Sequence, residues 1–271
     1  HRNKIGQVAY NLKGIATVTR QKYLTASEKG PWANSYDRWR NDNLTNRYQG
    51  VQFGYTSAGR YTSWNDIWSY PGYKERDILP GDYKYEDWNG DGEINGQDEH
   101  PFAFDQTPWL QFSLNAGLQW KNFDFNMLLQ GSALGSMEYK EPLHEIWGKN
   151  GGGALTQFLD RWHPVDPKAD PYDPSTVWTS GHYAYTGRWA KNNSAFNRVS
   201  TAYLRLKSIE LGYTFPKLKQ IPNASLRIYA NAYNLLTFTG VKFVDPEHPD
   251  DDLGRMYPLN KTYTLGVSLS F

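Results

Sequence analysis

The sequence of 271 residues contains no cysteine and no long hydrophobic segment. The absence of cysteine excludes disulfide bonds and thiolate metal sites. No apolar run approaches the roughly 18–20 residues that a transmembrane helix requires. The formal net charge is only +1, which gives no reason to expect nucleic acid as a partner. These absences exclude a disulfide scaffold and a helical membrane protein, and they leave no reason to propose a nucleic-acid-binding protein.

Aromatic residues, in contrast, make up 16% of the chain. Six segments alternate between apolar and polar residues with a period of two, which is typical of β-strands that have two different faces. In the fourth segment the alternation slips near Lys207, which predicts a β-bulge. Strands of membrane barrels show the same alternation. The six segments cover approximately residues 8–19, 110–120, 123–130, 202–215, 226–233 and 263–271.

The connections between these segments alternate strictly between short and long. A tight turn at Lys121 and Asn122 and a short link at residues 216–223 alternate with long connections over about 20–107, 132–200 and 237–261. Outer-membrane barrels have short periplasmic turns and long extracellular loops, whereas a β-sandwich shows turn signals about every 8–12 residues. We therefore predict an all-β chain that forms strands of a large antiparallel transmembrane β-barrel with long extracellular loops.

Two further features bear on the barrel. Trp109 and Trp120 lie near opposite ends of one expected strand, where the aromatic girdles of a membrane barrel are found.

Six strands are too few to close, because natural membrane barrels begin at about eight strands and an open edge leaves backbone groups unpaired in lipid. We therefore expect residues 1–271 to form the C-terminal part of a barrel whose other strands come from elsewhere.

Residues 87–98 have the spacing of an EF-hand-type calcium loop. Oxygen side chains stand at loop positions 1, 3, 5, 9 and 12, and Gly92 stands at the position of the sharp turn. The expected ligands are Asp87, Asn89, Asp91, Asn95 and Asp98, with the backbone carbonyl of Glu93. The alternative is an Asx- and glycine-rich turn whose carboxylates are simply solvated. If calcium binds, we expect a structural role.

Several stretches resemble the C-terminal barrel portion of SusC/RagA-type TonB-linked outer-membrane proteins of Bacteroidetes. The resemblance implies a barrel of about 22 strands around a plug, import of oligosaccharides or peptides driven through TonB, and a SusD-like surface lipoprotein as partner. It also implies that the terminal Phe271 is read by the barrel-assembly machinery. The plug and the TonB-contacting box are not in this sequence. The matching stretches are residues 81–92, 161–164, 203–207, 211–216, 232–239, 245–247 and 257–259, with the final strand.

Aromatic residues of the long loops are candidates for contact with substrate or with a partner protein, because Trp and Tyr bury a large area at low entropic cost. The alternative for each is packing between loops. On the polar stripe, Arg227, Tyr229 and Tyr233 are candidates for contact with substrate or with the plug. We find no catalytic constellation and expect no enzyme. The loop candidates are Trp147, Trp162, Trp178 and Trp189, with Tyr172 and Tyr183.

Two other functions remain open at this point. A secreted, calcium-stabilised carbohydrate-binding β-domain would bury the apolar stripes between two sheets. A receptor or scaffold of the outer membrane that does not transport would use the same barrel and the same lipid-facing strands.

Overall fold

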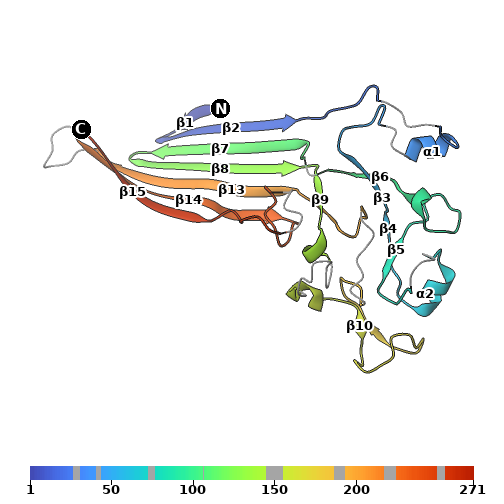
Figure 1. Ribbon diagram of the computed structural model, residues 1–271. Coiled ribbons are helices and arrows are strands. Elements are labelled where there is room, and N and C mark those ends of the chain that lie inside the picture. Colours follow the sequence, from blue (N-terminus) through green and yellow to red (C-terminus); the bar gives the residue numbers. More distant parts are fainter. Residues whose placement is uncertain are drawn as a thin grey trace.

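The chain folds around one seven-stranded antiparallel sheet (Figure 1). The computed structural model describes residues 1–26, 31–40, 44–72, 77–105, 107–144, 155–185, 193–216, 224–248 and 254–271. The strands of the sheet, in spatial order, are β1 (Arg2–Ile5), β2 (Val8–Val18), β7 (Leu110–Trp120), β8 (Phe123–Ala133), β13 (Tyr203–Phe215), β14 (Ser225–Thr239) and β15 (Thr262–Ser270).

The six strands expected from the alternation are present, and the structure adds β1. This strand of four residues is too short for a periodic signal, and it forms a hairpin in which Ile5 pairs with Val8. Gly6 makes the tight turn possible because its φ of +60° lies in the left-handed region. β8 and β14 extend further toward the long loops than the alternation indicated, to Ala133 and Thr239.

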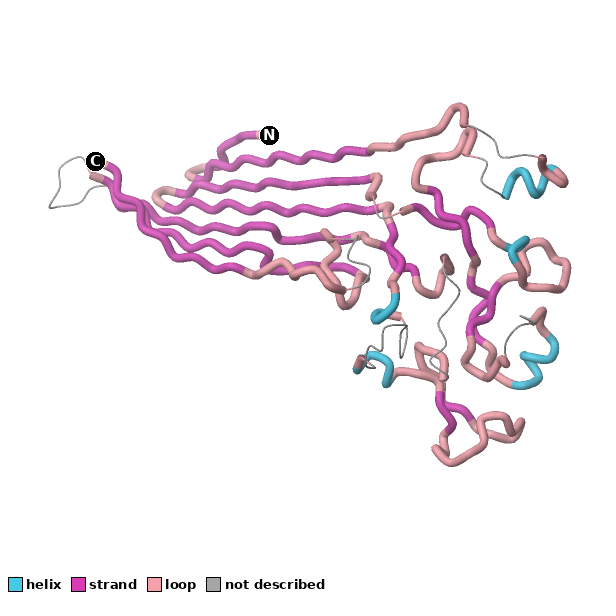
Figure 2. Tube along the Cα trace, in the orientation of Figure 1, coloured by secondary structure: helices cyan, strands magenta, loops and turns pink. Residues whose placement is uncertain are grey.

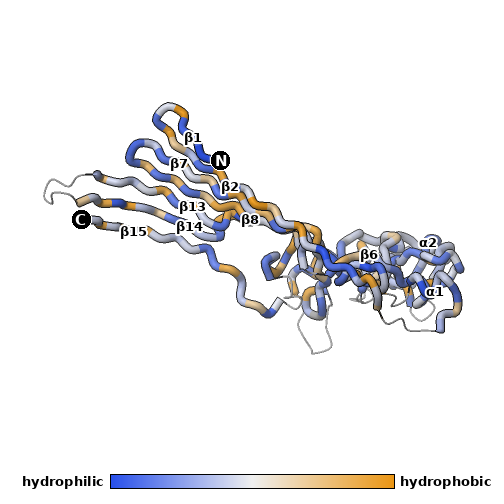
Figure 3. The backbone as a smooth tube through the Cα atoms, turned by 90° about the horizontal axis from the view of Figure 1, so that it is seen from above, coloured by the Kyte–Doolittle hydropathy of each residue, from blue (hydrophilic) through white to orange (hydrophobic). Residues whose placement is uncertain are grey.

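The two faces of the sheet differ in polarity, as the alternating colours along the strands show (Figure 3). Large apolar side chains of one face are exposed, and none of the described elements forms a second layer against them. A sandwich would bury such a stripe, whereas a strand in contact with lipid leaves it outside. Exposed members of the stripe are Leu12, Leu114, Leu118, Leu211, Ile228, Leu236, Leu265 and Val267.

All long connections leave from the same end of the sheet, opposite the C-terminus (Figure 1). They form small elements, and the helices of the described residues all lie there (Figure 2). No helix in the described part of the chain is long and apolar enough to span a membrane. The elements are α1 (Ser35–Arg40), β3 (Val51–Gly54), β4 (Ser57–Arg60), α2 (Trp64–Ser69), β5 (Tyr83–Tyr85), β6 (His100–Phe104), β9 (Ser136–Glu138), β10 (His163–Pro164), β11 (Trp178–Thr179) and β12 (Arg198–Ser200), with 3-10 turns at Gly96–Asp98, Glu141–Leu143 and Thr156–Leu159.

The loops have a small aromatic core of their own. Tyr55, Tyr85 and Ile94 are buried together, and Tyr83 and Phe196 pack against them. The ring of Phe196 meets that of Tyr83 edge-on at 4.7 Å between centroids. Such aromatic pairs bury large area and prefer edge-to-face geometry. This core makes the outer loops a folded layer on the end of the sheet.

The expectation that Trp109 and Trp120 form two interfacial girdles is wrong for Trp109 and stays a prediction for Trp120. Trp120 is half exposed beside the tight turn. Trp109 is only 9% exposed, because the ring of Phe104 packs on it at 3.8 Å and the guanidinium of Arg20 lies 4.0 Å from its centroid. Trp109 therefore anchors the loops to the sheet and cannot form part of an outer girdle.

Adjacent residues in the middle of β7 provide a test of the two faces. Leu114 is exposed on the apolar face and Asn115 is exposed on the polar face. We expect Leu114→Arg to destabilise the folded protein in lipid by about 2–4 kcal/mol, because a cation is costly at the bilayer midplane. Asn115→Arg is the matched control and should change stability by less than about 1 kcal/mol. Urea unfolding in lipid vesicles measures both; equal losses would contradict the assignment of faces.

Candidate functional site

The polar face of the sheet carries an open hollow of about 680 Å³ near the end where the loops leave. Its floor consists of side chains from β2, β7, β8 and β13, and residues 246–248 border it from above. Pockets of about 300–1,000 Å³ with a few placed polar groups are typical of ligand sites. The floor offers amides and hydroxyls that both donate and accept hydrogen bonds, among them Thr17, Gln111, Ser113, Gln130 and Ser132.

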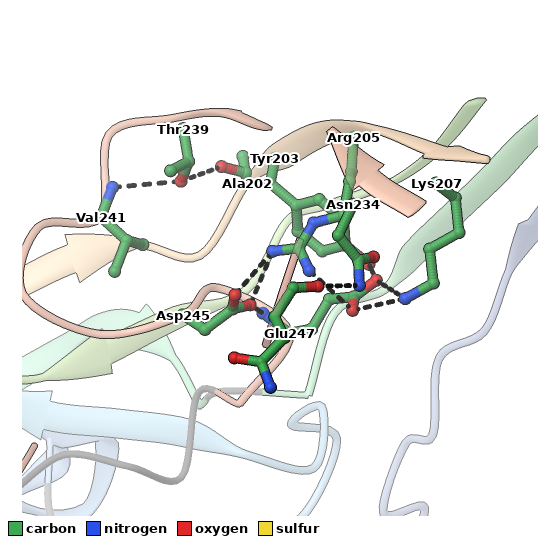
Figure 4. Close-up of polar contacts among 10 residues, drawn as sticks. Ala202, Tyr203, Arg205, Lys207, Asn234, Thr239, Val241, Asp245 and Glu247 are labelled. Atoms are coloured by element: carbon green, nitrogen blue, oxygen red, sulfur yellow. Dashed lines mark hydrogen bonds and ion pairs between the residues drawn. The ribbon is translucent and has the colours of Figure 1, made fainter. Parts of the chain in front are cut away.

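Arg205 links the rim of this hollow to the last outer loop (Figure 4). Its side chain lies on β13 and is only 1% exposed. Its Nη2 donates to both carboxylate oxygens of Asp245, at 2.7 and 2.8 Å, and its Nη1 donates to Glu247 at 3.1 Å. Lys207 and the hydroxyl of Tyr203 also donate to Glu247, at 2.8 and 3.1 Å. Two carboxylates from the loop are therefore fixed against the inner wall.

The β-bulge expected near Lys207 is present and explains why Arg205 faces inward. Leu206 and Ser208 pair with consecutive residues of β8, so Lys207 is an extra residue in β13. One extra residue reverses which side of a strand each following side chain occupies. Arg205 consequently lies on the same face as Glu210 although the two positions differ by an odd number.

A second ion-pair network lies further along the polar face. Arg227 of β14 donates to Asp124 of β8 at 3.1 Å through Nε and to Glu210 of β13 at 2.6 Å through Nη2. A Cβ at Gly212 would lie 2.6 Å from both Arg227 and Asp124, so glycine leaves room for the pair. The expected contact residue Arg227 is therefore already engaged in tying three strands together.

The two other polar-face candidates, Tyr229 and Tyr233, differ in how closely neighbouring residues hold their side chains. Tyr229 lies over its cross-strand partner Gly266, where a Cβ would come within 2.2 Å of the tyrosine ring. The guanidinium of Arg227 lies 4.8 Å from the centroid of Tyr229, so this ring is held from two sides. Tyr233 is half exposed and remains available for contact.

The acidic loop folds into a compact turn that its own backbone stabilises. The carboxylate of Asp87 accepts hydrogen bonds from the backbone N–H groups of Gly90 and Gly92, both at 2.8 Å. Asp98 is fully buried and accepts from the N–H groups of Trp88 and Asn95, at 2.9 and 2.7 Å. The left-handed φ of +84° at Gly92 is the sharp turn that the spacing required.

The loop offers oxygen atoms of the kind that a hard cation binds, but its carboxylates alone are too few. Within the described residues no three His, Cys, Asp or Glu side chains come together closely enough to hold a metal. A calcium ion would therefore depend also on the amide oxygens of Asn89 and Asn95 and on the carbonyl of Glu93, which are ordinary calcium ligands. Asn95 additionally caps the 3-10 turn and accepts from the N–H of Gln97 at 2.7 Å.

The structure places four of the six outer-loop aromatic candidates. Trp162 and Trp178 line a common cavity. Tyr183 packs edge-on against Phe158 at 4.6 Å, which is packing between loops, whereas Tyr172 is half exposed. Trp147 and Trp189 lie outside the described residues, as do the glycine run 151–153 and the acidic run 250–252. Phe271 follows β15 at the opposite end of the sheet and is 97% exposed.

Burial sets the protonation of several outer-loop groups. Desolvation raises the pKa of Tyr61 and the pKa of Tyr183 to about 12, so both hydroxyls keep their protons at neutral pH. Burial, with Arg60 nearby, lowers the pKa of His182. Lys84 donates to Asp66 at 2.7 Å and lowers the pKa of that carboxyl. The two tyrosines are therefore neutral and Asp66 is ionised at neutral pH.

Sequence reasoning missed the contact of Arg205 with Asp245 and Glu247. The stretches that contain them were recognised separately, as parts of a family pattern. The available signal was complementary charge, since two basic residues near the bulge match two acidic residues in the last loop. Forty residues separate the partners in the chain, and only the folded sheet brings them together.

Removal of Arg205 should release the last outer loop. We expect Arg205→Ala to cost about 3–5 kcal/mol, because it removes the cation that pairs with the mostly buried Asp245, while Glu247 keeps Lys207 and Tyr203 as donors. Lys207→Ala removes the more exposed cation of the network and should cost about 0–1 kcal/mol. Thermal unfolding and hydrogen exchange of residues 240–248 measure both effects. Unchanged protection of this loop in Arg205→Ala would contradict its role as an anchor.

The chain is similar in sequence to three curated receptors, although no protein-family model matches it. TonB-dependent receptor P3 of Formosa agariphila is 28% identical over 211 residues, covering 72% of this chain and 19% of the receptor. TonB-dependent receptor P26 of the same organism is 26% identical over 83% of this chain and 22% of the receptor. TonB-dependent receptor SusC of Bacteroides thetaiotaomicron is 25% identical over 76% of this chain and 19% of the receptor.

Solved structures share the fold. The RagAB peptide transporter matches with a TM-score of 0.65 at 18% identity, over 99% of this chain and 28% of that chain. The RagAB peptide importer in its open-open state matches with a TM-score of 0.61. The chain spans about a fifth of the length of the curated relatives it matches. These relatives are receptors and transporters, which agrees with the expectation of no enzyme. In sequence the chain is thus similar to SusC-type TonB-dependent receptors, and in fold to the RagA barrel, as its motifs indicated.

Proposed function

We propose that the protein containing this chain imports oligosaccharides or peptides across the outer membrane by a TonB-dependent mechanism. This chain contributes lipid-facing strands, part of the inner wall and three sets of outer loops. The observation that carries the proposal is the two-faced sheet, whose apolar side chains are exposed while its polar face carries a hollow floored by amides and hydroxyls. The sequence similarity of the chain to TonB-dependent receptors supports the same proposal.

The proposed partners follow from the same similarity. A SusD-like lipoprotein would cover the outer loops, whose exposed apolar residues include Trp68, Leu159 and Val177. Aromatic residues such as Trp68 are enriched in protein interfaces. TonB would contact a part of the protein that this chain does not contain, and the barrel-assembly machinery would read the exposed Phe271 at the end of β15.

Import through the polar face can be tested by filling the hollow. Ser113 lies on its floor between Ile15 and Gln130, whereas Leu110 of the same strand lies on the apolar face. We expect Ser113→Trp to reduce uptake of labelled oligomers by cells severalfold, because the indole occupies the hollow. Leu110→Trp should leave uptake unchanged, since tryptophan is tolerated on a lipid-facing surface near an interface.

Uptake should also stop when TonB is inactivated in the same cells. Surface binding without uptake in cells with active TonB would instead indicate a receptor or scaffold that does not transport. Uptake that persists without TonB would contradict the proposed mechanism.

We further propose that the loop of residues 87–98 binds calcium as a structural ion. The proposal is supported by the turn at Gly92 and by the oxygen-rich donor set. Asp87 already accepts backbone hydrogen bonds that draw the loop around itself. An ion would neutralise the carboxylates that this turn gathers, and it would stabilise the outer-loop core through the neighbouring buried Ile94.

Calorimetric titration of the intact protein tests the calcium proposal. We expect saturable binding with a Kd of about 10⁻⁴–10⁻³ M, typical of single extracellular sites. The double variant Asp87→Ala, Asp91→Ala should lose this binding. Glu93→Gln is the matched control, because it changes a side chain but keeps the backbone carbonyl that is the expected ligand. Equal binding by the double variant and the wild type would remove the site.

A further inference from the structure

Residues 241–248 of the last outer loop form a strap between the end of β14 and the polar-face hollow (Figure 4). At the near end of the strap, Val241 is buried and its N–H donates to the hydroxyl of Thr239, the last residue of β14, at 3.1 Å. At the far end, residues 246–248 line the hollow. A movement of the strap would therefore change access to the hollow from the side of the loops.

The far end of the strap is firmly attached. The Oδ1 atom of Asp245 accepts the N–H of Glu247, and its backbone carbonyl accepts the N–H of His248, both at 2.9 Å. The same carboxylate pairs with the buried guanidinium of Arg205 at 2.7 Å. Charge-assisted hydrogen bonds of this kind are about twice as strong as neutral ones. This end therefore acts as the anchor of the strap.

The other attachment is one tyrosine hydroxyl from a different connection, that of residues 132–200. Tyr139 directly follows β9, and its hydroxyl donates to the carbonyl of Lys242 and accepts the N–H of the same residue, both at 2.9 Å. We call this contact the tyrosine clasp. It joins two outer loops through neutral groups, whose hydrogen bonds give only a modest net stability because water can replace them.

The residue beside the clasp has an unfavourable backbone conformation. Phe243 has a φ of +70°, in the left-handed region. A Cβ makes this region costly, and a bulky side chain there is an outlier. The ring of Phe243 is 51% exposed and meets that of Tyr139 at 5.9 Å between centroids, so burial returns little of this cost. Release of the clasp would let this backbone relax.

The two ends of the strap therefore differ in how easily they open. Strained residues persist only where surrounding contacts hold them, and they occur at clamps and switch regions. The benefit of two neutral hydrogen bonds and the cost of one bulky left-handed residue are of similar size. The near end is thus close to balance, whereas the ion pair of Arg205 keeps the far end in place.

We propose that the strap is a gate that releases at the tyrosine clasp and swings about the anchor at Asp245. Release would separate the two outer loops that the clasp joins and widen the approach to the hollow. The strain at Phe243 keeps the cost of opening low. This inference rests on the proposed use of the polar face as a passage and adds a means of regulating entry.

Hydrogen exchange of the intact protein in phosphatidylcholine vesicles measures release of the clasp. Phe243→Val and Phe243→Gly both remove the ring, but valine raises the cost of a positive φ and glycine removes it. We expect the amide of Lys242 to exchange at least about fivefold faster in Phe243→Val than in Phe243→Gly, with the wild type between them. Equal exchange in these two variants would overturn the proposal.

Thiol labelling of the hollow floor tests whether release opens the passage. The chain has no cysteine, so Ser113→Cys places its one thiol on the floor. We expect fluorescein maleimide, a bulky reagent, to react severalfold faster when Tyr139→Phe is added, because the phenyl ring cannot form the clasp. Addition of Phe243→Gly should slow the reaction severalfold. Methyl methanethiosulfonate, a small reagent, should react at the same rate in every variant.

Tyr172→Phe is the matched control, because it removes the hydroxyl of a half-exposed tyrosine in the same connection as Tyr139 but outside the clasp. Equal labelling by the bulky reagent in the Tyr139→Phe and Tyr172→Phe variants would overturn the gate. So would a rate increase that is the same for both reagents, since it would indicate general loosening of the loops. Uptake without TonB would instead contradict the proposed function and leave the exchange and labelling results unaffected.

Discussion

Hydrogen bonding between neighbouring strands is the constraint on which the rest of this structure depends. It fixes the backbone of the large sheet and leaves each side chain only two directions. Most large apolar groups, such as Leu114 and Leu265, take one direction, and most polar groups take the other. Because a strand cannot satisfy its backbone in lipid without partners, one pattern determines both how the sheet is held together and where it meets a membrane.

The polar face then needs its own means of support, because a water-facing wall without a packed core gains little from hydrophobic burial. Here charged side chains connect strands and loops. Arg227 joins three strands, and Arg205 joins the wall to the last outer loop. A buried ion pair is costly to form and more costly to break, so such contacts favour a single position for the loop over several alternatives. The ion pairs therefore give the rim of the hollow a fixed shape.

The alternation of residues such as those of β7 was sufficient to predict the strands, because this signal is local. The compact turn around Gly92 was predictable for the same reason. In contrast, the burial of Trp109 depends on Phe104 and Arg20, which come from different segments. The contact of Arg205 with the last loop depends on pairing between distant strands. The outer-loop cavity that Trp64, Trp162 and Trp178 line likewise combines separate loop segments, and sequence reasoning named two of these tryptophans without Trp64.

The extra residue at Lys207 carries a consequence for how this sheet can evolve. Beyond this residue, the side chains of β13 exchange faces relative to a regular strand. The pairing of β14 with β13 is also irregular between Leu206 and Ser208, so the apolar side chains of the two strands stay on one face. Loss of one residue from β13 alone would turn the guanidinium of Arg205 to the apolar face of the sheet and leave the carboxylate of Asp245 without its cation. An insertion or deletion in this part of the sheet therefore changes the face that the residues beyond it occupy, as the extra residue at Lys207 does relative to β8.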